Sequence, residues 1–213
     1  MRADENGDRA LGKARLEALS DGVFAIAMTL LVLDLRMPEL PHTASSMDIL
    51  RAFVALRATF LAFVITFLLA GSFWYLHHVT FHNIRYITRG VAAINVLFLM
   101  FVSLLPFSTG LLGRFGLGSP AAQAVYFSNQ LALGLVLNLQ WVVARRLGLL
   151  ILPIGDPRAR LMIAVQPLCC VAALATVAYP PVSYWAFLFG MLGGRLIARR
   201  RFKPMPADAA APL

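Results

Sequence analysis

Residues 15–35 read RLEALSDGVFAIAMTLLVLDL, and this stretch decides what kind of fold the chain has. Its apolar part, residues 19–35, is close to the roughly 20 residues that an α-helix needs to cross the hydrocarbon core of a membrane. Ser20 and Asp21 stand at the start of this part, where either side chain can cap a helix by accepting from backbone N–H groups. Alternatively, residues 15–35 form one continuous helix that contains Asp21, and a carboxylate inside a membrane needs a partner. The stretch itself leaves both interpretations open.

Five more apolar runs follow this first one, separated by short polar segments. The chain is 60% hydrophobic and 14% charged, whereas soluble domains are about 45–50% apolar and about 25% charged. We therefore predict an all-α integral membrane protein with six transmembrane helices in one domain, residues 1–203, and a disordered tail at residues 204–213. The predicted spans are residues 19–35, 58–76, 92–108, 121–143, 161–179 and 182–197. The third span should end in a glycine-rich turn that contains Gly110, Gly113, Gly116 and Gly118.

Positive charge is divided unequally between the two sides of these spans. With both termini in the cytoplasm, 15 of the 19 Lys and Arg residues lie on the cytoplasmic side. Only Arg36, Arg51, Arg57 and Arg114 remain outside, which agrees with the positive-inside rule for multi-pass proteins. The segment 38–57 is then predicted to be an external loop. Because the basic residues cluster between apolar runs, the formal charge of +9 indicates a cell-membrane protein and no nucleic-acid partner.

The residues around the first span resemble a known signature. Arg15-x-x-x-Leu19-Ser20-Asp21-Gly22 is similar to the RxxxFSDG motif of the transmembrane protein 175 family of potassium channels, in its prokaryotic branch, with Leu19 in place of the family's Phe. The resemblance continues through FWYLHHVTF at residues 73–81 and NVLFLMF at residues 95–101. It implies a homotetramer in the lipid bilayer that conducts potassium ions through a central pore lined by the first helix, with modest selectivity over sodium and without a cofactor.

The resemblance also implies two groups of functional residues. One is a hydrophobic constriction of Ile or Leu side chains in place of a carbonyl filter, and no TVGYG motif occurs in the sequence. The other is a buried polar network that holds the first helix against the second and third, because an unpaired polar group in hydrocarbon costs several kcal/mol. Its members would be Arg15, Ser20, Asp21, Trp74, His77 and Asn95.

Helical periodicity is consistent with the pore that the resemblance implies, because it places the candidate constriction residues on one side of the first helix. At 100° per residue, Ile26 and Leu33 lie about 20° apart, with Leu30 about 40° to one side and Thr29 about 60° to the other. Asp21 lies about 140° from Ile26, so we expect it to face the bundle of its own subunit. Asp34, near the external end of the helix, would place a ring of carboxylates at the mouth of the pore. An apolar stripe in a membrane helix is otherwise typical of ordinary packing or lipid contact.

Two residue clusters suggest chemistry other than conduction. His78 and His82 are four residues apart on one helical face, and His77 adjoins them, but no Cys or carboxylate lies near them in sequence to complete a metal site. Cys169 and Cys170 are adjacent, so in a helix they point about 100° apart and are poorly placed for a disulfide. We interpret them as small buried residues and predict no resident metal.

Other functions are weighed against the channel. A proton-coupled secondary transporter would use Asp21 and His77 as a relay, and inverted repeats with broken mid-membrane helices would favour it. We find neither feature in the sequence, although Pro106 lies where it can break the end of the third span. An enzyme would need a catalytic constellation, and Ser20, Asp21 and His77 lack the G-x-S-x-G elbow of a hydrolase. The sequence therefore predicts a channel and no enzyme.

Overall fold

The computed structural model describes residues 2–36, 38–151 and 157–201, and this part of the chain is almost entirely helical. Its elements are α1 (Arg2–Leu30), the 3-10 turn η1 (Leu31–Asp34), α2 (Ser46–Ala55), α3 (Arg57–His82), α4 (Arg89–Ser103), α5 (Leu105–Phe115), α6 (Pro120–Arg146), α7 (Pro157–Ala175) and α8 (Pro180–Arg201). Within the described residues, four stretches are long and apolar enough to cross a membrane: Gly12–Asp34, Arg57–His82, Arg89–Phe115 and Pro120–Arg146. The predicted all-helical membrane fold is confirmed at this level. The predicted tail, residues 204–213, lies outside the described residues.

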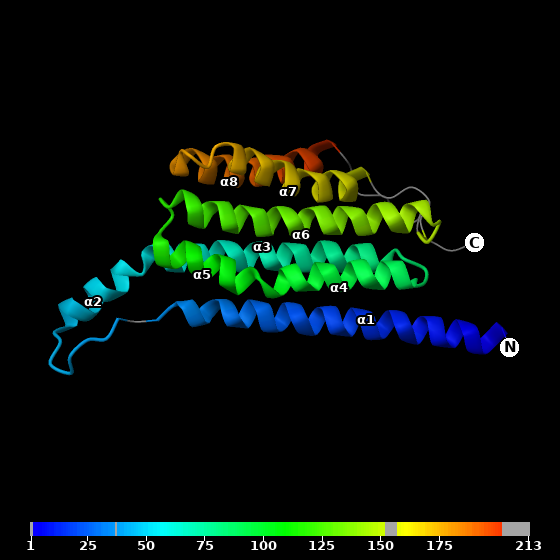
Figure 1. Ribbon diagram of the computed structural model, residues 1–213, viewed down its shortest axis with the longest axis horizontal. Helices are drawn as coiled ribbons and strands as arrows, with labels where there is room; N and C mark the ends of the chain where they lie inside the picture. Colours follow the sequence, from blue (N-terminus) through cyan, green and yellow to red (C-terminus); the bar gives the residue numbers. More distant parts are fainter. Residues whose placement is uncertain (1, 37, 152–156, 202–213) are drawn as a thin grey trace.

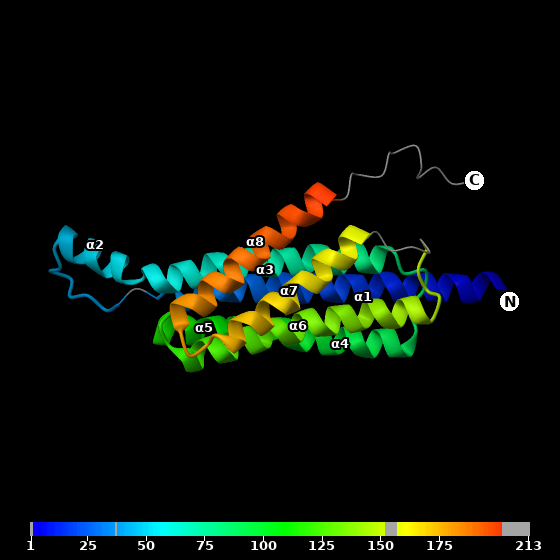
Figure 2. The same ribbon diagram turned by 90° about the horizontal axis from the view of Figure 1, so that it is seen from above.

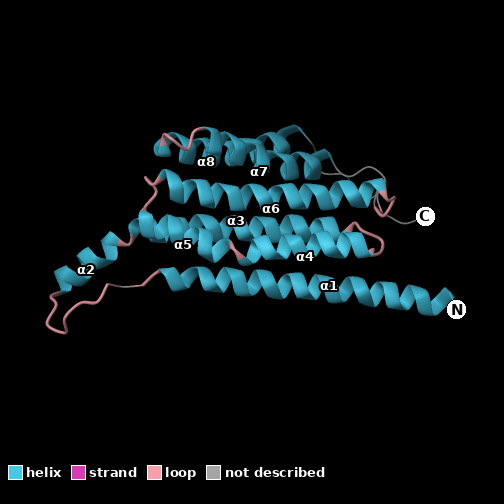
Figure 3. Cartoon of the chain, in the orientation of Figure 1, coloured by secondary structure: helices cyan, strands magenta, loops and turns pink. Residues whose placement is uncertain are grey.

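The long helices lie side by side in layers (Figure 1). α1 forms one edge of the bundle, α3, α4 and α5 form the next layer, α6 the third, and α7 with α8 the opposite edge. Figure 2, a view turned by 90°, shows α8 running toward the end of the bundle where α1 begins. The connecting loops gather at the two ends (Figure 3). Because α1 is an edge helix, its contacts are mainly with α3, α4 and α5, and one of its sides has no neighbour in the described part of the chain.

The third span consists of two helices, α4 and α5, and is longer than predicted. α4 ends at Ser103 and α5 begins at Leu105. Pro106 stands in the first turn of α5, where a missing N–H is tolerated but cannot continue the hydrogen-bond ladder of α4. α5 then continues to Phe115, beyond the predicted end of the span at residue 108. Together the two helices form one stretch of 27 residues that is apolar enough to span a membrane.

Two glycines that we expected in a turn lie inside α5 instead. Their role is close approach: a Cβ at Gly110 would lie 2.7 Å from Oδ2 of Asp34, and one at Gly113 would lie 2.9 Å from Cγ2 of Thr59. We interpreted this run of glycines as a turn. At Gly110 and Gly113 the structure instead has a helix whose neighbours come too close for a side chain. The turn comes later, at Gly116, whose φ of 79° is a conformation that glycine adopts readily.

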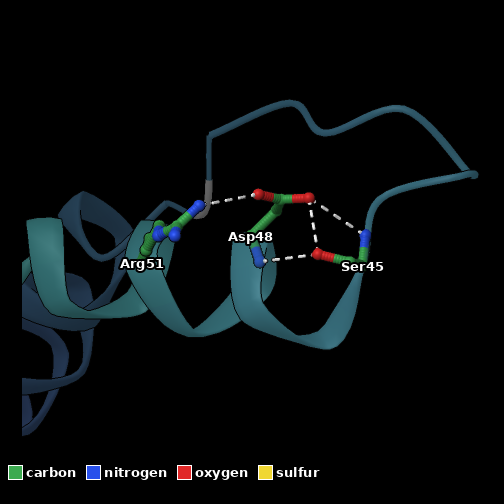
Figure 4. A network of polar contacts seen from close by, with 3 residues as sticks. All are labelled: Ser45, Asp48 and Arg51. Carbon is green, nitrogen blue, oxygen red and sulfur yellow. Dashed lines mark hydrogen bonds and ion pairs between the residues drawn. The ribbon is translucent and has the colours of Figure 1, made fainter.

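A helix also occupies part of the segment 38–57, which we predicted as a loop. α2 starts after Ser45, whose hydroxyl accepts from the backbone N–H of Asp48 at 3.2 Å, while Oδ2 of Asp48 accepts from the backbone N–H of Ser45 at 3.1 Å (Figure 4). The Ser45 hydroxyl also donates to Oδ2 of Asp48 at 2.7 Å, and this bond, more than the one from the Ser45 backbone N–H, lowers the pKa of Asp48. Arg51 adds an exposed ion pair with Asp48 at 3.4 Å. This reciprocal capping explains why α2 forms here.

The loops at the end where α1 begins are tied to one another. The α3–α4 loop and the segment after α6 meet in an isolated antiparallel bridge between Ile84 and Leu150. Lys13 of α1 donates from Nζ to the backbone oxygen of Ile84 at 2.7 Å and to that of His82 at 3.3 Å. α1 is thereby attached, at Lys13, to the end of α3.

α7 and α8 pack closely at a glycine. A Cβ at Gly190 of α8 would lie 2.7 Å from Sγ of Cys169 in α7, so only a residue without a side chain allows this approach. Cys169 and its neighbour Cys170 are both free thiols and both buried. The two cysteines therefore contribute to packing between α7 and its neighbours.

Candidate functional site

The first helix has one packed face and one face without neighbours in the described chain. The packed face repeats at intervals of four and three residues, which is the period of a helix, and is at most 3% exposed: Ser20, Phe24, Ala27 and Leu31. On the opposite face, Ile26 is 61% exposed, Leu33 56% and Leu30 42%. Three large apolar side chains thus stay exposed on this side of the helix.

The four residues predicted to form a constriction all lie on this exposed side: Ile26, Thr29 and Leu30 in α1, and Leu33 in η1, which continues it. Thr29 is the polar member, and its hydroxyl donates to the backbone oxygen of Ile26 at 2.8 Å. Gly22 lies one turn before Ile26, and a Cβ added there would meet nothing within 4 Å. This side of α1 therefore has no side chain at Gly22. Its hydroxyl, that of Thr29, is hydrogen-bonded to the backbone of α1 itself.

On the packed side, a buried polar cluster joins α1 to α3, α4 and α6. Asn95 donates from Nδ2 to the Ser20 hydroxyl at 3.1 Å, and its Oδ1 lies 2.7 Å from Nε2 of His77. Since a carbonyl oxygen only accepts, Nε2 of His77 carries the proton in this contact. Gln140 of α6 makes a longer contact from Nε2 to the same Oδ1 at 3.5 Å. Ser20, His77, Asn95 and Gln140 are all buried, so Asn95 is the central member of the cluster.

Aromatic side chains enclose His77. Its ring stacks on Phe81 with centroids 4.3 Å apart, and on Phe98 with centroids 5.2 Å apart and planes 4° from parallel. Phe24 of α1 lies 6.2 Å from the same ring in a tilted arrangement. The cluster is therefore shielded on several sides, and its hydrogen bonds have a fixed geometry that defines the rotation of α1 against α3 and α4.

The remaining members of the predicted network lie elsewhere. Asp21 is exposed, and its Oδ1 accepts from Nε1 of Trp74 at 2.8 Å. Arg15 is also exposed, and within the described structure no hydrogen bond or ion pair to its side chain is present. The structure thus divides the predicted set into a buried cluster, an exposed Asp21–Trp74 pair and a separate Arg15. A helical wheel alone did not reveal this, because Asp21 lies at the margin of the packed face beside the edge of α3.

Asp34 lies at the other end of α1, in a groove between α1, α3 and α5. The groove is lined by apolar side chains, Thr59, and three charged residues, Asp34, Arg36 and Arg114. The carboxylate of Asp34 rests against Gly110, as described above, so it is directed toward α5. The predicted mouth residue therefore shares its surroundings with two arginines that sequence reasoning did not associate with it.

The histidines considered for metal binding form a stacked row on α3. The rings of His78 and His82 are 6.4 Å apart between centroids, and His78 also stacks on Trp74 at 5.8 Å. In the described part of the chain, no three His, Cys, Asp or Glu side chains gather where they could hold a metal ion. The row thus has aromatic contacts and no third ligand among the described residues.

A second polar cluster, nearer the α2 end, was missed from the sequence. Thr109 of α5 donates to the hydroxyl of Thr66 at 3.2 Å, and this hydroxyl lies 3.1 Å from that of Tyr126. Beside it, Asn129 of α6 donates to Ser108 at 3.2 Å. The available signal was the series of polar residues at helical spacing within the apolar run of α6, of which Gln140 is also a part. α6 is therefore the polar centre of the subunit.

Comparison with known proteins places this geometry in a known context. The family described as "Endosomal/lysosomal potassium channel TMEM175" matches residues 15–106. A potassium channel of Streptomyces collinus is 32% identical over 208 residues, which cover 93% of this chain and 97% of the relative. The human endosomal/lysosomal proton channel TMEM175 is 39% identical over 101 residues, covering 45% of this chain and 20% of the human protein. The match to the bacterial relative therefore extends over nearly the full length of both chains.

Solved structures agree with these sequence relatives. The crystal structure of a lysosomal potassium-selective channel TMEM175 homolog from Chamaesiphon minutus superposes with a TM-score of 0.74 and 27% identity, covering 88% of this chain and 98% of the other. A point variant of the potassium channel MtTMEM175, crystallised with a nanobody fusion protein, superposes with a TM-score of 0.62 at 18% identity, covering 87% of this chain and 92% of the other. The second likeness shows a common fold alone.

Proposed function

The chain belongs to the TMEM175 family of potassium channels, in its prokaryotic branch, and on this premise we propose how its helices form the conduction path. It is a multi-pass membrane protein that conducts potassium ions; it is not an enzyme, and it needs no cofactor beside the permeant ion. We propose that four copies surround a central axis with α1 innermost, and that α7 and α8 complete a six-helix domain over residues 1–203. At 19 and 22 residues, these two helices reach about 30 Å at 1.5 Å per residue.

The same proposal includes the orientation in the cell membrane. Both termini lie in the cytoplasm and α2 lies outside, because 15 of the 19 basic residues are then cytoplasmic. The α2 end of the bundle is thus its outer end. The Ile84–Leu150 bridge and the contacts of Lys13 then belong to the cytoplasmic end.

The uncovered face of α1 is the observation that carries the pore proposal. Ile26, Leu30 and Leu33 are exposed on an edge helix whose opposite face is packed and hydrogen-bonded. Four copies of this face around one axis would form apolar rings, with Thr29 as the polar group at that depth. Such a ring closes a pore when water leaves it. An ion in the ring would give up its hydration shell and receive no carbonyl oxygen in exchange. Potassium sheds water more easily than sodium, so the ring favours it modestly without binding it.

The buried cluster would serve this pore by positioning α1. Ser20, Asn95 and His77 set the rotation of the helix, and therefore the direction of Ile26. The alternative of a proton-coupled transporter needs a relay between Asp21 and His77. Within the described structure Asp21 bonds to Trp74 and His77 bonds to Asn95, so the two residues belong to separate hydrogen-bonded groups and form no direct relay.

Ile26→Asn tests the proposal directly. A polar ring holds water, so we expect the single-channel conductance of the purified protein in planar bilayers to rise several-fold and the potassium-to-sodium permeability ratio to fall. Leu68→Asn is the matched control, since Leu68 is equally exposed and apolar but lies on α3. It should leave both quantities unchanged. If a folded Ile26→Asn protein conducts and selects like the parent, this face does not line the pore.

A further inference from the structure

The groove at the outer end of α1 contains more positive than negative charge. Asp34, Arg36 and Arg114 all line it, together with Leu30 and Leu33 of the proposed pore face. All three charged side chains are exposed. In the described structure neither arginine forms an ion pair with Asp34. The three charges therefore act on the groove as separate groups with a net charge of +1 per subunit.

The positions of these side chains are fixed by the local backbone. Asp34 belongs to η1, which continues α1, and its carboxylate rests on Gly110 of α5. Arg114 lies four residues later on α5, one helical turn nearer the outer end. Arg36 donates from Nε to the backbone oxygen of Leu33 at 3.2 Å, which holds its guanidinium beside the end of α1. The guanidiniums of Arg36 and Arg114 and the carboxylate of Asp34 thus lie around the same end of the first helix.

We propose that Asp34, Arg36 and Arg114 form a net-positive outer mouth, which lowers the potassium concentration at the external end of the pore and limits inward current at low ionic strength. This inference rests on the proposed function, in which α1 lines the pore. With four copies the mouth carries a charge of +4. The wider external surface does not reverse this sign: Arg51 and Arg57 add two positive charges, and Glu39 and Asp48 add two negative ones.

The effect of such a mouth depends on salt. The Debye length is about 30 Å at about 0.01 M salt and about 3 Å at about 1 M. At low salt the potential of all four subunits adds at the axis and repels cations, whereas at high salt each charge is screened before it reaches the permeating ion. The ring of Asp34 carboxylates would by itself attract potassium, but the two arginines outweigh it.

Charge substitutions test this by the sign of their effects. Arg114→Gln brings the mouth to neutrality, and we expect it to raise inward potassium current about twofold at about 10 mM external salt, with little change at about 1 M. Asp34→Asn adds to the positive charge and should lower the inward current by a similar factor. The double variant, Asp34→Asn with Arg114→Gln, has the net charge of the parent and should restore its current. Outside-out membrane patches fix which side of the channel faces the low-salt solution.

Three further proteins make the result decisive. Arg114→Lys keeps the charge and should behave as the parent, and Arg51→Gln removes an external arginine outside this groove and should have a smaller effect than Arg114→Gln. If Arg114→Gln and Asp34→Asn change the current in the same direction, or not at all, while Ile26→Asn still alters conduction, the positive mouth is refuted and the pore proposal stands. If Ile26→Asn is also without effect, the pore assignment fails together with the mouth.

Discussion

The two faces of α1 differ in what holds them in place. The packed face is covered by α3 and α4, and its Ser20 is hydrogen-bonded within a buried cluster. On the exposed face, Ile26, Leu30 and Leu33 stay accessible, and Leu30 and Leu33 border the groove beside α5. The comparison indicates that one helix contains two groups of residues with separate roles. In the proposed channel, residues on the packed face set the folding of the subunit and the rotation of α1, and residues on the exposed face line the conduction path.

The largest effect should come from the centre of the packed side. Asn95→Leu removes the acceptor used by His77 and Gln140, and each buried donor left without a partner costs about 1–3 kcal/mol. We expect a loss of about 2–5 kcal/mol in the free energy of unfolding, measured by thermal unfolding in detergent. Val96→Leu changes the adjacent, exposed residue of α4 and should be nearly neutral. Equal stability of the two variants would mean that the cluster does not hold α1.

Substitutions at two alanines compare the two sides of α1, with a smaller expected loss of stability. Ala27 is buried, so Ala27→Leu inserts methylene groups into a filled space and should cost about 1–3 kcal/mol of stability. Ala25 is exposed, and Ala25→Leu should change the free energy of unfolding by no more than about 0.5 kcal/mol. Thermal unfolding of both proteins in one detergent gives the comparison. The distinction between the faces fails if the two substitutions destabilise equally.

The smallest effect belongs to the pair at the margin between the faces. Asp21→Asn removes the charge but keeps a carbonyl oxygen that accepts from Trp74, so we expect a loss of stability below about 1 kcal/mol. Trp74→Phe removes the donor itself and should cost slightly more. Neither should alter the potassium-to-sodium permeability ratio, because the proposed pore side chains are unchanged. A folded Asp21→Asn channel with a changed ratio would place this carboxylate on the conduction path.

Sequence reasoning reached the helical class and the first span, but it could not separate the two faces of α1. Phe24, Ala27 and Leu31 are as apolar as Ile26, Leu30 and Leu33, so the sequence contains two equivalent stripes at helical spacing. In a membrane both lipid and protein are apolar, and hydrophobicity does not distinguish a packed side from an open one. The choice of stripe came from the resemblance to a family of channels.

The features missed from the sequence have different causes. Gln140 joins the buried cluster from a helix 45 residues after Asn95, and such a contact depends on tertiary packing rather than on local pattern. Gly110 allows contact with Asp34, yet the same residue type is also typical of turns. The start of α2 was visible in principle, because Ser45 and Asp48 have the spacing of a capping pair. We predicted a loop there because the segment lies between the first two predicted spans.

The polar series along α6 has a consequence for how the protein is made. α6 has a mean hydropathy of 1.2, against 1.8 to 2.2 for the other three candidate spans, and half of its most apolar window is buried. A helix of this kind gains little from lipid alone, because buried amides such as those of Gln130 and Gln140 are poorly solvated there. When α6 leaves the ribosome, α3, α4 and α5 have already been synthesised and can offer it a protein surface. α6 is therefore expected to insert as a partner of helices already present, and its delivery into the bilayer depends on the order in which the chain is synthesised.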